Sequence, residues 1–108
     1  MTGNLFGSEE VARGVPVPML PSEIVRIETA KMIAGVCDKT IRVWAKRDGI
    51  GRQSDRGAPL QISAPALCMR IDGQREALER FRNGERDHPT VKFYIQRAYS
   101  LLALVGGR

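Results

Sequence analysis

The sequence contains few of the residues from which most metal and catalytic sites are built. His88 is the single histidine, and the two cysteines, Cys37 and Cys68, lie far apart and lack CxxC spacing. With so few ligand residues, we expect no metal site and no cofactor. The acids Glu9 and Glu10 lie in a stretch too irregular to hold two carboxylates in the fixed geometry of acid–base catalysis. Because a Gly-Lys-Ser/Thr phosphate-binding loop is missing as well, we expect no enzymatic activity.

Long hydrophobic runs are also missing from the sequence. No apolar stretch approaches the roughly 18–20 residues that a membrane-spanning helix needs, so we expect no membrane partner. The first residues, MTGNLFGSEEVARG, show no basic start followed by an apolar core, so we expect no secretory signal and a cytoplasmic location. The length of 108 residues and the hydrophobic content of 43% are typical of one globular domain.

Positive charge is concentrated in one short segment. The whole chain has 17 Lys and Arg against 12 Asp and Glu, which gives a net charge of +5. Residues 39–56 alone carry six cations and two acids, a surplus of four positive charges. The six cations are Lys39, Arg42, Lys46, Arg47, Arg52 and Arg56. This surplus favours a polyanionic partner, and the alternative is a solvated basic surface that binds nothing.

Helix and turn signals divide the start of this segment into a helix, a turn and a second helix. We expect the first helix over residues 29–34, ended by Gly35, which adopts a left-handed turn without steric cost. The second helix begins near Asp38 and continues for about ten residues. Helical spacing places three apolar residues on its buried side: Ile41, Trp44 and Ala45.

Short β-strands are expected on both sides of this helical pair. Residues 23–27 alternate weakly and are β-branched, as in a short strand. Residues 50–53 and 60–62 resemble two strands joined by a polar loop, which predicts a β-hairpin. Ser63 is a good N-cap for a third helix, and Pro65 fits its first turn.

The C-terminal third of the chain is expected to be helical. We expect one helix over residues 74–83 and a longer one that starts at Pro89, with either His88 or Asp87 as its cap, and runs to about residue 105. The longer helix has an apolar stripe made of Val91, Tyr94, Ile95, Ala98, Leu101, Leu102 and Val105. Two interpretations stay open. The stripe packs back on the rest of the chain, or, as we favour, it forms a homo-oligomer interface.

Residues 35–44, Gly-Val-Cys-Asp-Lys-Thr-Ile-Arg-Val-Trp, resemble a known pattern. They are similar to the turn and recognition helix of the MerR-like winged helix-turn-helix group. This group includes phage and mobile-element excisionases and some phage terminase small subunits. The hairpin and the helix capped by Ser63 extend the resemblance over residues 24–72, with Cys37 in place of the usual serine cap.

The resemblance implies a mainly α fold with a small β-hairpin wing. It assigns residues 23–73 to the winged helix-turn-helix domain. The proline and glycine content of residues 1–22 predicts a flexible N-terminal arm, and the helical pattern of residues 74–108 predicts a C-terminal helical extension that the resemblance does not cover. Double-stranded DNA would be contacted by the second helix and the wing. The expected contact residues are Lys39, Thr40, Arg42, Val43, Lys46, Arg47, Arg52 and Arg56. Arg42 is the best candidate for a base or close phosphate contact.

Three DNA-binding roles fit this resemblance. The favoured one is an excisionase, or recombination directionality factor, which binds adjacent sites cooperatively and bends DNA, with an integrase as a possible partner. The alternatives are a small transcriptional regulator and a phage terminase small subunit. A module that binds only protein is the competing class. Each contact between a cation and a phosphate contributes about −0.9 to the slope of the logarithm of DNA affinity against the logarithm of salt concentration. Six such contacts predict a slope near −5.

Overall fold

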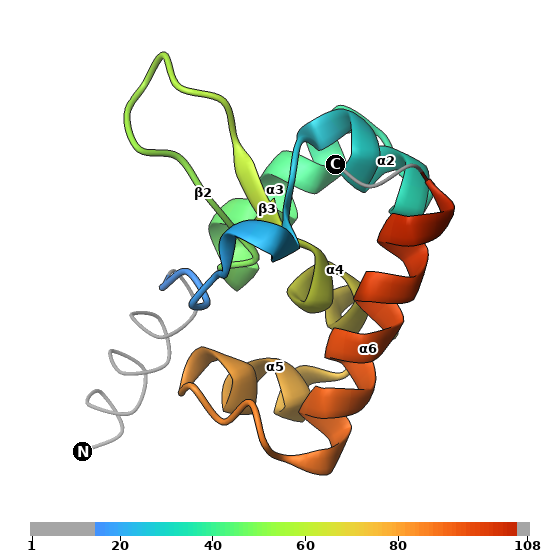
Figure 1. The fold of residues 1–108 in the computed structure, drawn as a ribbon. Helices are drawn as coiled ribbons and strands as arrows, with labels where there is room; N and C mark the ends of the chain where they lie inside the picture. Colours follow the sequence, from blue (N-terminus) through green and yellow to red (C-terminus); the bar gives the residue numbers. More distant parts are fainter. Residues whose placement is uncertain (1–14, 106–108) are drawn as a thin grey trace, which may run out of the picture.

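Five α-helices and three short strands make up residues 15–105, the part of the chain that the computed structural model describes. In chain order the elements are the 3-10 helix η1 (Pro21–Glu23), β1 (Ile24–Val25), α2 (Ile27–Ala34), α3 (Asp38–Asp48), β2 (Gly51–Arg52), β3 (Gln61–Ser63), α4 (Ala64–Ile71), α5 (Arg75–Arg82) and α6 (Pro89–Leu104). The expected mainly α fold with a small β-sheet is therefore confirmed. Figure 1 shows α4 between the α2, α3 and sheet region and the two C-terminal helices, α5 and α6.

The sheet joins the predicted hairpin to the strand expected upstream of the helical pair. β3 lies between β1 and β2 and is antiparallel to both, with Ser63 opposite Ile24 and Ile62 opposite Gly51. Ile62 is fully buried, so this pairing ties the hairpin to the core. The loop that connects β2 to β3 projects away from the body of the molecule (Figure 1).

Glycine follows both helices of the predicted helix–turn–helix pair. α2 ends at Ala34, and Gly35 adopts the left-handed conformation with a φ of 70°. α3 spans eleven residues, and Gly49 follows it, also with a φ of 70°. The predicted turn at Gly35 and the predicted start and length of α3 are confirmed, whereas α2 begins at Ile27, two residues before the predicted start. Cys37 occupies the N-cap position of α3 without a capping hydrogen bond from its side chain.

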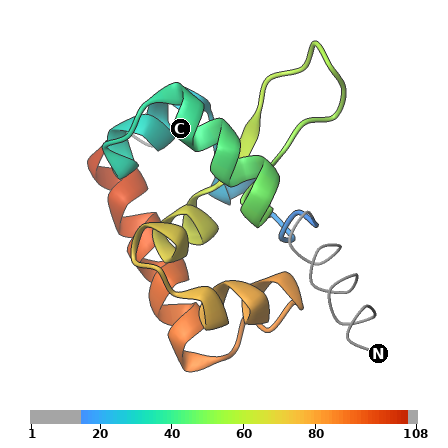
Figure 2. The same cartoon turned by 180° about the vertical axis from the view of Figure 1, so that it is seen from behind.

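α4 forms the centre of the core. Ser63 caps it as predicted, because its hydroxyl accepts a hydrogen bond from the N–H of Ala66 at 3.2 Å. Residues 64–69 are all buried, including Pro65 in the first turn. α6 runs along α4, as the opposite views in Figures 1 and 2 agree. The described part of the chain has no helix that is both long enough and apolar enough to cross a membrane.

The apolar stripe of α6 faces this core. Four members, Val91, Tyr94, Ala98 and Leu102, are buried within the chain, and the other three, Ile95, Leu101 and Val105, are half-buried. The expectation that the buried members form an oligomer interface is wrong, because α4 and its neighbours already cover them. The other interpretation, packing back on the chain, describes the stripe. Homo-oligomerisation itself stays a prediction and would need another surface.

Residues 15–22 lie against the domain, although we expected all of residues 1–22 to form a flexible arm. Val17 is 1% exposed, and its N–H donates to the carbonyl of Gly49 at 2.9 Å. A Cβ added to Gly49 would lie 2.1 Å from the carbonyl oxygen of Val15, so this close approach requires glycine. The expectation of an arm is wrong for residues 15–22, and residues 1–14 lie outside the described range.

One hydrophobic core extends across the boundary that we expected between residues 73 and 74. Ile62 of β3, Leu67 of α4 and Phe81 of α5 all belong to it and are fully buried. The buried carboxylate of Glu23 pairs with Arg86 from the loop before α6. The C-terminal helices are therefore an integral part of the fold.

Candidate nucleic-acid interface

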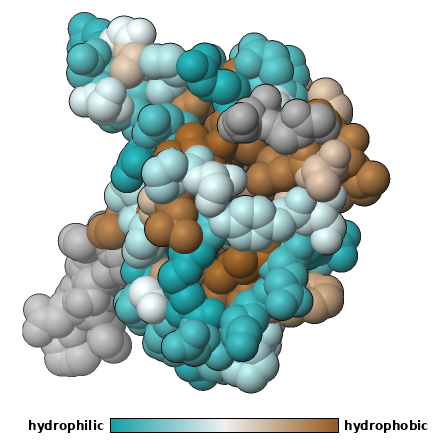
Figure 3. Space-filling view, viewed as in Figure 1, coloured by the Kyte–Doolittle hydropathy of each residue, from teal (hydrophilic) through white to brown (hydrophobic). Residues whose placement is uncertain are grey.

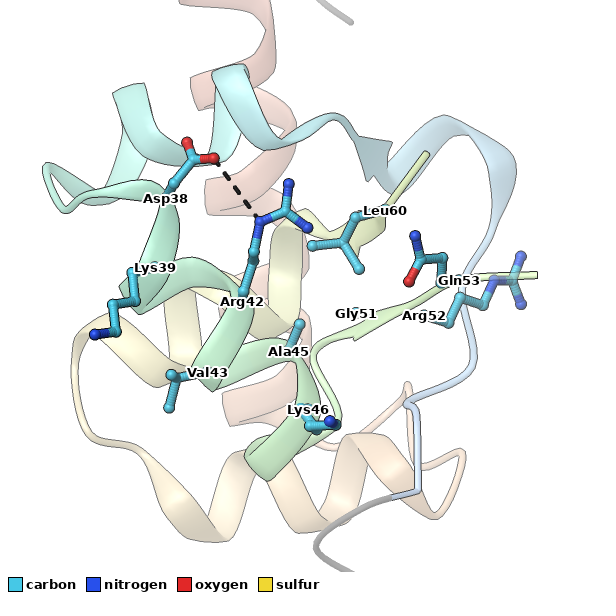
Figure 4. A pocket seen from close by; sticks show the side chains of 10 residues that line it. All are labelled: Asp38, Lys39, Arg42, Val43, Ala45, Lys46, Gly51, Arg52, Gln53 and Leu60. Carbon is cyan, nitrogen blue, oxygen red and sulfur yellow. Dashed lines mark ion pairs between the residues drawn. The ribbon is translucent and has the colours of Figure 1, made fainter. Parts of the chain in front are cut away.

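A groove of about 670 Å³ separates α3 from the hairpin. Its lining includes four cations from two different elements, Lys39, Arg42 and Lys46 from α3 and Arg52 from β2. Asp38 is the one acid among the lining residues. Figure 4 shows the α3 side chains on one side of the groove and Gly51, Arg52, Gln53 and Leu60 on the other. The fold thus brings together most of the basic residues that the sequence predicted as one surface.

The amphipathic character of α3 determines which side chains reach this surface. Ile41 and Ala45 are buried against the core, which turns the opposite side of the helix outward. The exposed side chains are Lys39, Arg42, Val43, Lys46 and Arg47. Thr40 differs from the other expected contacts, because it is half-buried and its hydroxyl lies 3.5 Å from the Sγ of Cys37.

Asp38 moderates the positive charge at one end of the groove. Its carboxylate lies 2.9 Å from the Nζ of Lys31 and 3.8 Å from the Nε of Arg42. The hydrogen bond to Asp38 raises the pKa of Lys31. Both pairs are partly exposed, so each contributes little to stability.

Hydrogen bonds within the hairpin orient its polar side chains. The Nε of Arg52 donates to the Oε1 of Gln61 on the paired strand at 3.0 Å, which positions this guanidinium along β2. The amide of Gln53 donates to the carbonyl of Ala58 at 2.6 Å, across the loop. Arg56 lies exposed in this loop and does not line the groove. Any contact from Arg56 would therefore be made by the projecting end of the hairpin.

The floor of the groove depends on a glycine. A Cβ added to Gly51 would lie 2.8 Å from the Cβ of Ala45, shorter than real contacts between such atoms. β2 therefore approaches α3 more closely than any other residue type at position 51 would allow.

Two polar residues at this surface were not among the expected contacts. Arg26 precedes α2 and is exposed, and it lines a recess of about 230 Å³ together with Arg42, Gln53 and Leu60. Gln53 lines both this recess and the groove. The sequence did not point to Arg26, because this cation is isolated and lies outside the basic segment. The pairing of β1 with β3 places it beside the hairpin.

The far side of α3 is braced by α4. The guanidinium of Arg70 lies 4.4 Å from the centre of the Trp44 ring, and its Nε donates to the carboxylate of Asp48 at 2.8 Å. Trp44 is half-buried and packs against the core, which confirms that its ring is used for packing. These contacts hold α3 against the domain from the side opposite to its exposed residues.

Arg82 of α5 holds the C-terminal end of α3. Its guanidinium donates to the carbonyl of Asp48 from Nη2 at 2.9 Å and from Nη1 at 3.2 Å. Nη1 also donates to the carbonyl of Val15 at 3.1 Å, and only 5% of the side chain is exposed. A helix leaves its last carbonyl groups without intrahelical partners, and Arg82 satisfies one of them. The sequence showed no signal for this long-range contact.

The two thiols lie in opposite environments. Hydrogen bonds from Thr40 lower the pKa of Cys37, which is exposed at the start of α3, whereas burial raises the pKa of Cys68 to about 11. Among residues 15–105, no cluster of three or more His, Cys, Asp or Glu side chains could hold a metal ion.

Five of the eight expected contacts thus line one groove, namely Lys39, Arg42, Val43, Lys46 and Arg52. The other three, Thr40, Arg47 and Arg56, do not line it. Comparisons with models of known protein families, with curated proteins and with solved structures find no match to this chain.

Proposed function

We propose that this chain is a winged helix-turn-helix protein that binds double-stranded DNA sequence-specifically. In this proposal α3 enters the major groove, and the β2–β3 hairpin contacts the adjacent backbone or minor groove. The observation that carries the proposal is the basic groove itself. Four cations from α3 and β2 line it against a single acid, a concentration of charge that suits phosphate.

The dimensions of α3 agree with this role. An α-helix with its side chains is about 10–12 Å across, and the major groove of B-DNA is about 12 Å wide, so a regular helix of eleven residues such as α3 fits into it. Arg42 is the best placed for a base edge or a close phosphate, because it lines the groove from the middle of α3. Its weak pairing with Asp38 at 3.8 Å leaves its donors available.

The more specific role we propose is that of an excisionase that binds neighbouring sites cooperatively, bends DNA and acts with an integrase. It rests on the resemblance of residues 35–44, and a transcriptional regulator or terminase small subunit would use the same contacts. Cooperative binding needs self-association outside the buried stripe. Hydrophobic side chains gather where the end of α6 approaches α2 (Figure 3), and the exposed ones there include Met32 at 65% and Leu104 at 81%.

The proposal is tested by fluorescence anisotropy with a random 30-base-pair duplex at several salt concentrations. The wild-type chain is compared with Arg42→Ala and with Lys92→Ala, which removes one exposed charge from α6. We expect steeply salt-dependent binding that Arg42→Ala weakens and Lys92→Ala does not. Stepwise isotherms on longer duplexes would further favour the excisionase role.

Two results would contradict DNA binding through α3. One is the lack of binding even at low salt, and the other is binding that responds equally to both substitutions. A nearly salt-independent association with protein alone would support the competing class, a protein-interaction module.

A further inference from the structure

A second basic recess, of about 210 Å³, lies where the end of α3 meets α4 and α5. Four arginines line it, against two acids, Asp48 and Glu79. The arginines are Arg47, Arg70, Arg75 and Arg82. Three of the four come from α4 and α5 and lie outside the basic segment that the sequence singled out.

The four arginines fall into two pairs with different tasks. Arg70 and Arg82 are engaged within the fold, through the carboxylate of Asp48 at 2.8 Å and its carbonyl at 2.9 Å. Arg47 and Arg75 are exposed, and no ion pair within residues 15–105 engages either of them. The Nε of Arg82 is buried without an acceptor in the same range. The recess therefore combines two held guanidinium groups with two that are available to a ligand.

The recess and the basic groove lie on opposite flanks of α3. Figure 2 shows α3 crossing between the projecting hairpin and the α4–α5 pair. The outward side of α3 carries a row of side chains at four-residue spacing, made of Lys39, Val43 and Arg47. The last of these, Arg47, lines the recess. If α3 occupies the major groove, the two DNA backbones that border this groove run along its two flanks.

We infer that this recess binds a phosphate of the second DNA backbone, with Arg47 and Arg75 as its direct ligands. The inference rests on the proposed function and assigns to the α4–α5 junction a contact that the α3–hairpin surface alone would not make. Arg70 pairs with Asp48 at 2.8 Å and Arg82 with Glu79 at 3.4 Å, so these two arginines balance the two acids of the recess and hold its walls in place. The surplus positive charge of the recess therefore belongs to Arg47 and Arg75. The chain thus contacts the bound duplex on both sides of α3, and its C-terminal part contributes directly to the affinity for DNA.

Charge continuity favours DNA over an acidic protein segment as the occupant. Lys46 lines the groove and the next residue, Arg47, lines the recess, so the basic surface is continuous across α3. The apolar side chains at the recess, Met69 and Leu78, are buried and offer little to a protein partner, whose binding energy comes mainly from apolar anchors.

The test compares the salt dependence of duplex binding for wild type, Arg75→Gln and the matched control Lys92→Gln. Arg75 is exposed, so the fold should tolerate its substitution, which circular dichroism verifies. Each lost phosphate contact lowers the slope of the log–log plot by about 0.9. When the salt concentration rises from 50 to 200 mM, the factor by which affinity falls should therefore be about 3.5 times smaller for Arg75→Gln than for wild type. For Lys92→Gln this factor should equal that of wild type.

The outcomes separate this inference from the proposed function. An unchanged slope in Arg75→Gln, together with a reduced slope in Arg42→Ala, would overturn the inference and leave the proposed function intact. Equal reductions in Arg75→Gln and Lys92→Gln would also overturn it, because they would reflect net charge alone. Polyglutamate that binds through Arg75, with an unchanged DNA slope, would assign the recess to an acidic protein instead. A slope that responds to neither Arg42→Ala nor Arg75→Gln would refute the DNA-binding function itself.

Discussion

The replacement of Arg82 by alanine should destabilise the chain strongly, although this residue belongs to a short C-terminal helix. The guanidinium lies between the end of α3 and the N-terminal residues 15–17, with only 5% of the side chain exposed. Its two terminal nitrogens donate three hydrogen bonds to the carbonyls of Asp48 and Val15, at 2.9 to 3.2 Å. Alanine would leave both acceptors without this partner and would open a space beneath the last turn of α3.

The expected loss can be worked from these contacts. Hydrogen bonds to a charged group contribute about 1.5–3 kcal/mol each, but here two of the three share the carbonyl of Asp48. Counting one strong and one weaker contact, we expect Arg82→Ala to lower the free energy of unfolding by about 3 kcal/mol. This is a large fraction of the roughly 5–15 kcal/mol that stabilises a typical domain. Lysine can reach one carbonyl and should recover about half of the loss.

Urea denaturation measures this effect directly. With a denaturant dependence of about 1.5 kcal/mol per molar, the unfolding midpoint of Arg82→Ala should fall by about 2 M. The matched control is Arg75→Ala in the same helix, which is exposed and should change the free energy of unfolding by less than about 0.5 kcal/mol. The reasoning would be refuted if the midpoint of Arg82→Ala equalled that of wild type or that of Arg75→Ala.

Further predictions concern the cap of α4 and the two thiols. Ser63→Ala should lower the free energy of unfolding by about 1 kcal/mol, because the buried N–H of Ala66 at the start of α4 loses its acceptor. Thermal melting measures this loss, and an unchanged melting temperature would contradict the prediction. At neutral pH a thiol reagent should modify Cys37 and leave Cys68 unmodified until the chain unfolds, because burial raises the pKa of Cys68 to about 11. Thr40→Val should slow the reaction of Cys37, since hydrogen bonds from Thr40 lower the pKa of this thiol and so favour its reactive thiolate form; equal rates in both variants would show that Thr40 has no such influence.

Local signals explain the parts of the fold that the sequence predicted well. Gly35 ends α2, and Ser63 caps α4; each acts on residues no more than one helical turn away. The turn after α2, the start of α3 and the cap of α4 can therefore be predicted from the sequence. The hairpin is predictable for the same reason, because two short strand patterns flank a polar loop.

Long-range contacts explain what the sequence did not reveal. The apolar stripe of α6 is compatible with a partner protomer or with the chain itself, and only the packing of α6 along α4 distinguishes them. Val17 and Arg82 act through backbone carbonyls more than 30 residues away, to which no local pattern points. The candidate site divides in the same way. The cations of α3 follow from helical periodicity, whereas the recess with Arg75 exists only because α5 folds back toward the end of α3.

The most direct test of DNA binding by α3 and the hairpin is an NMR titration of the ¹⁵N-labelled chain with a 15-base-pair duplex at low salt. This experiment locates the contact surface without knowledge of the target sequence. We expect the largest chemical-shift changes in residues 39–47 and 51–61, smaller ones near Arg75, and almost none in the outer part of α6. Changes confined to α6, or no changes at all, would contradict the assignment of the basic groove to DNA.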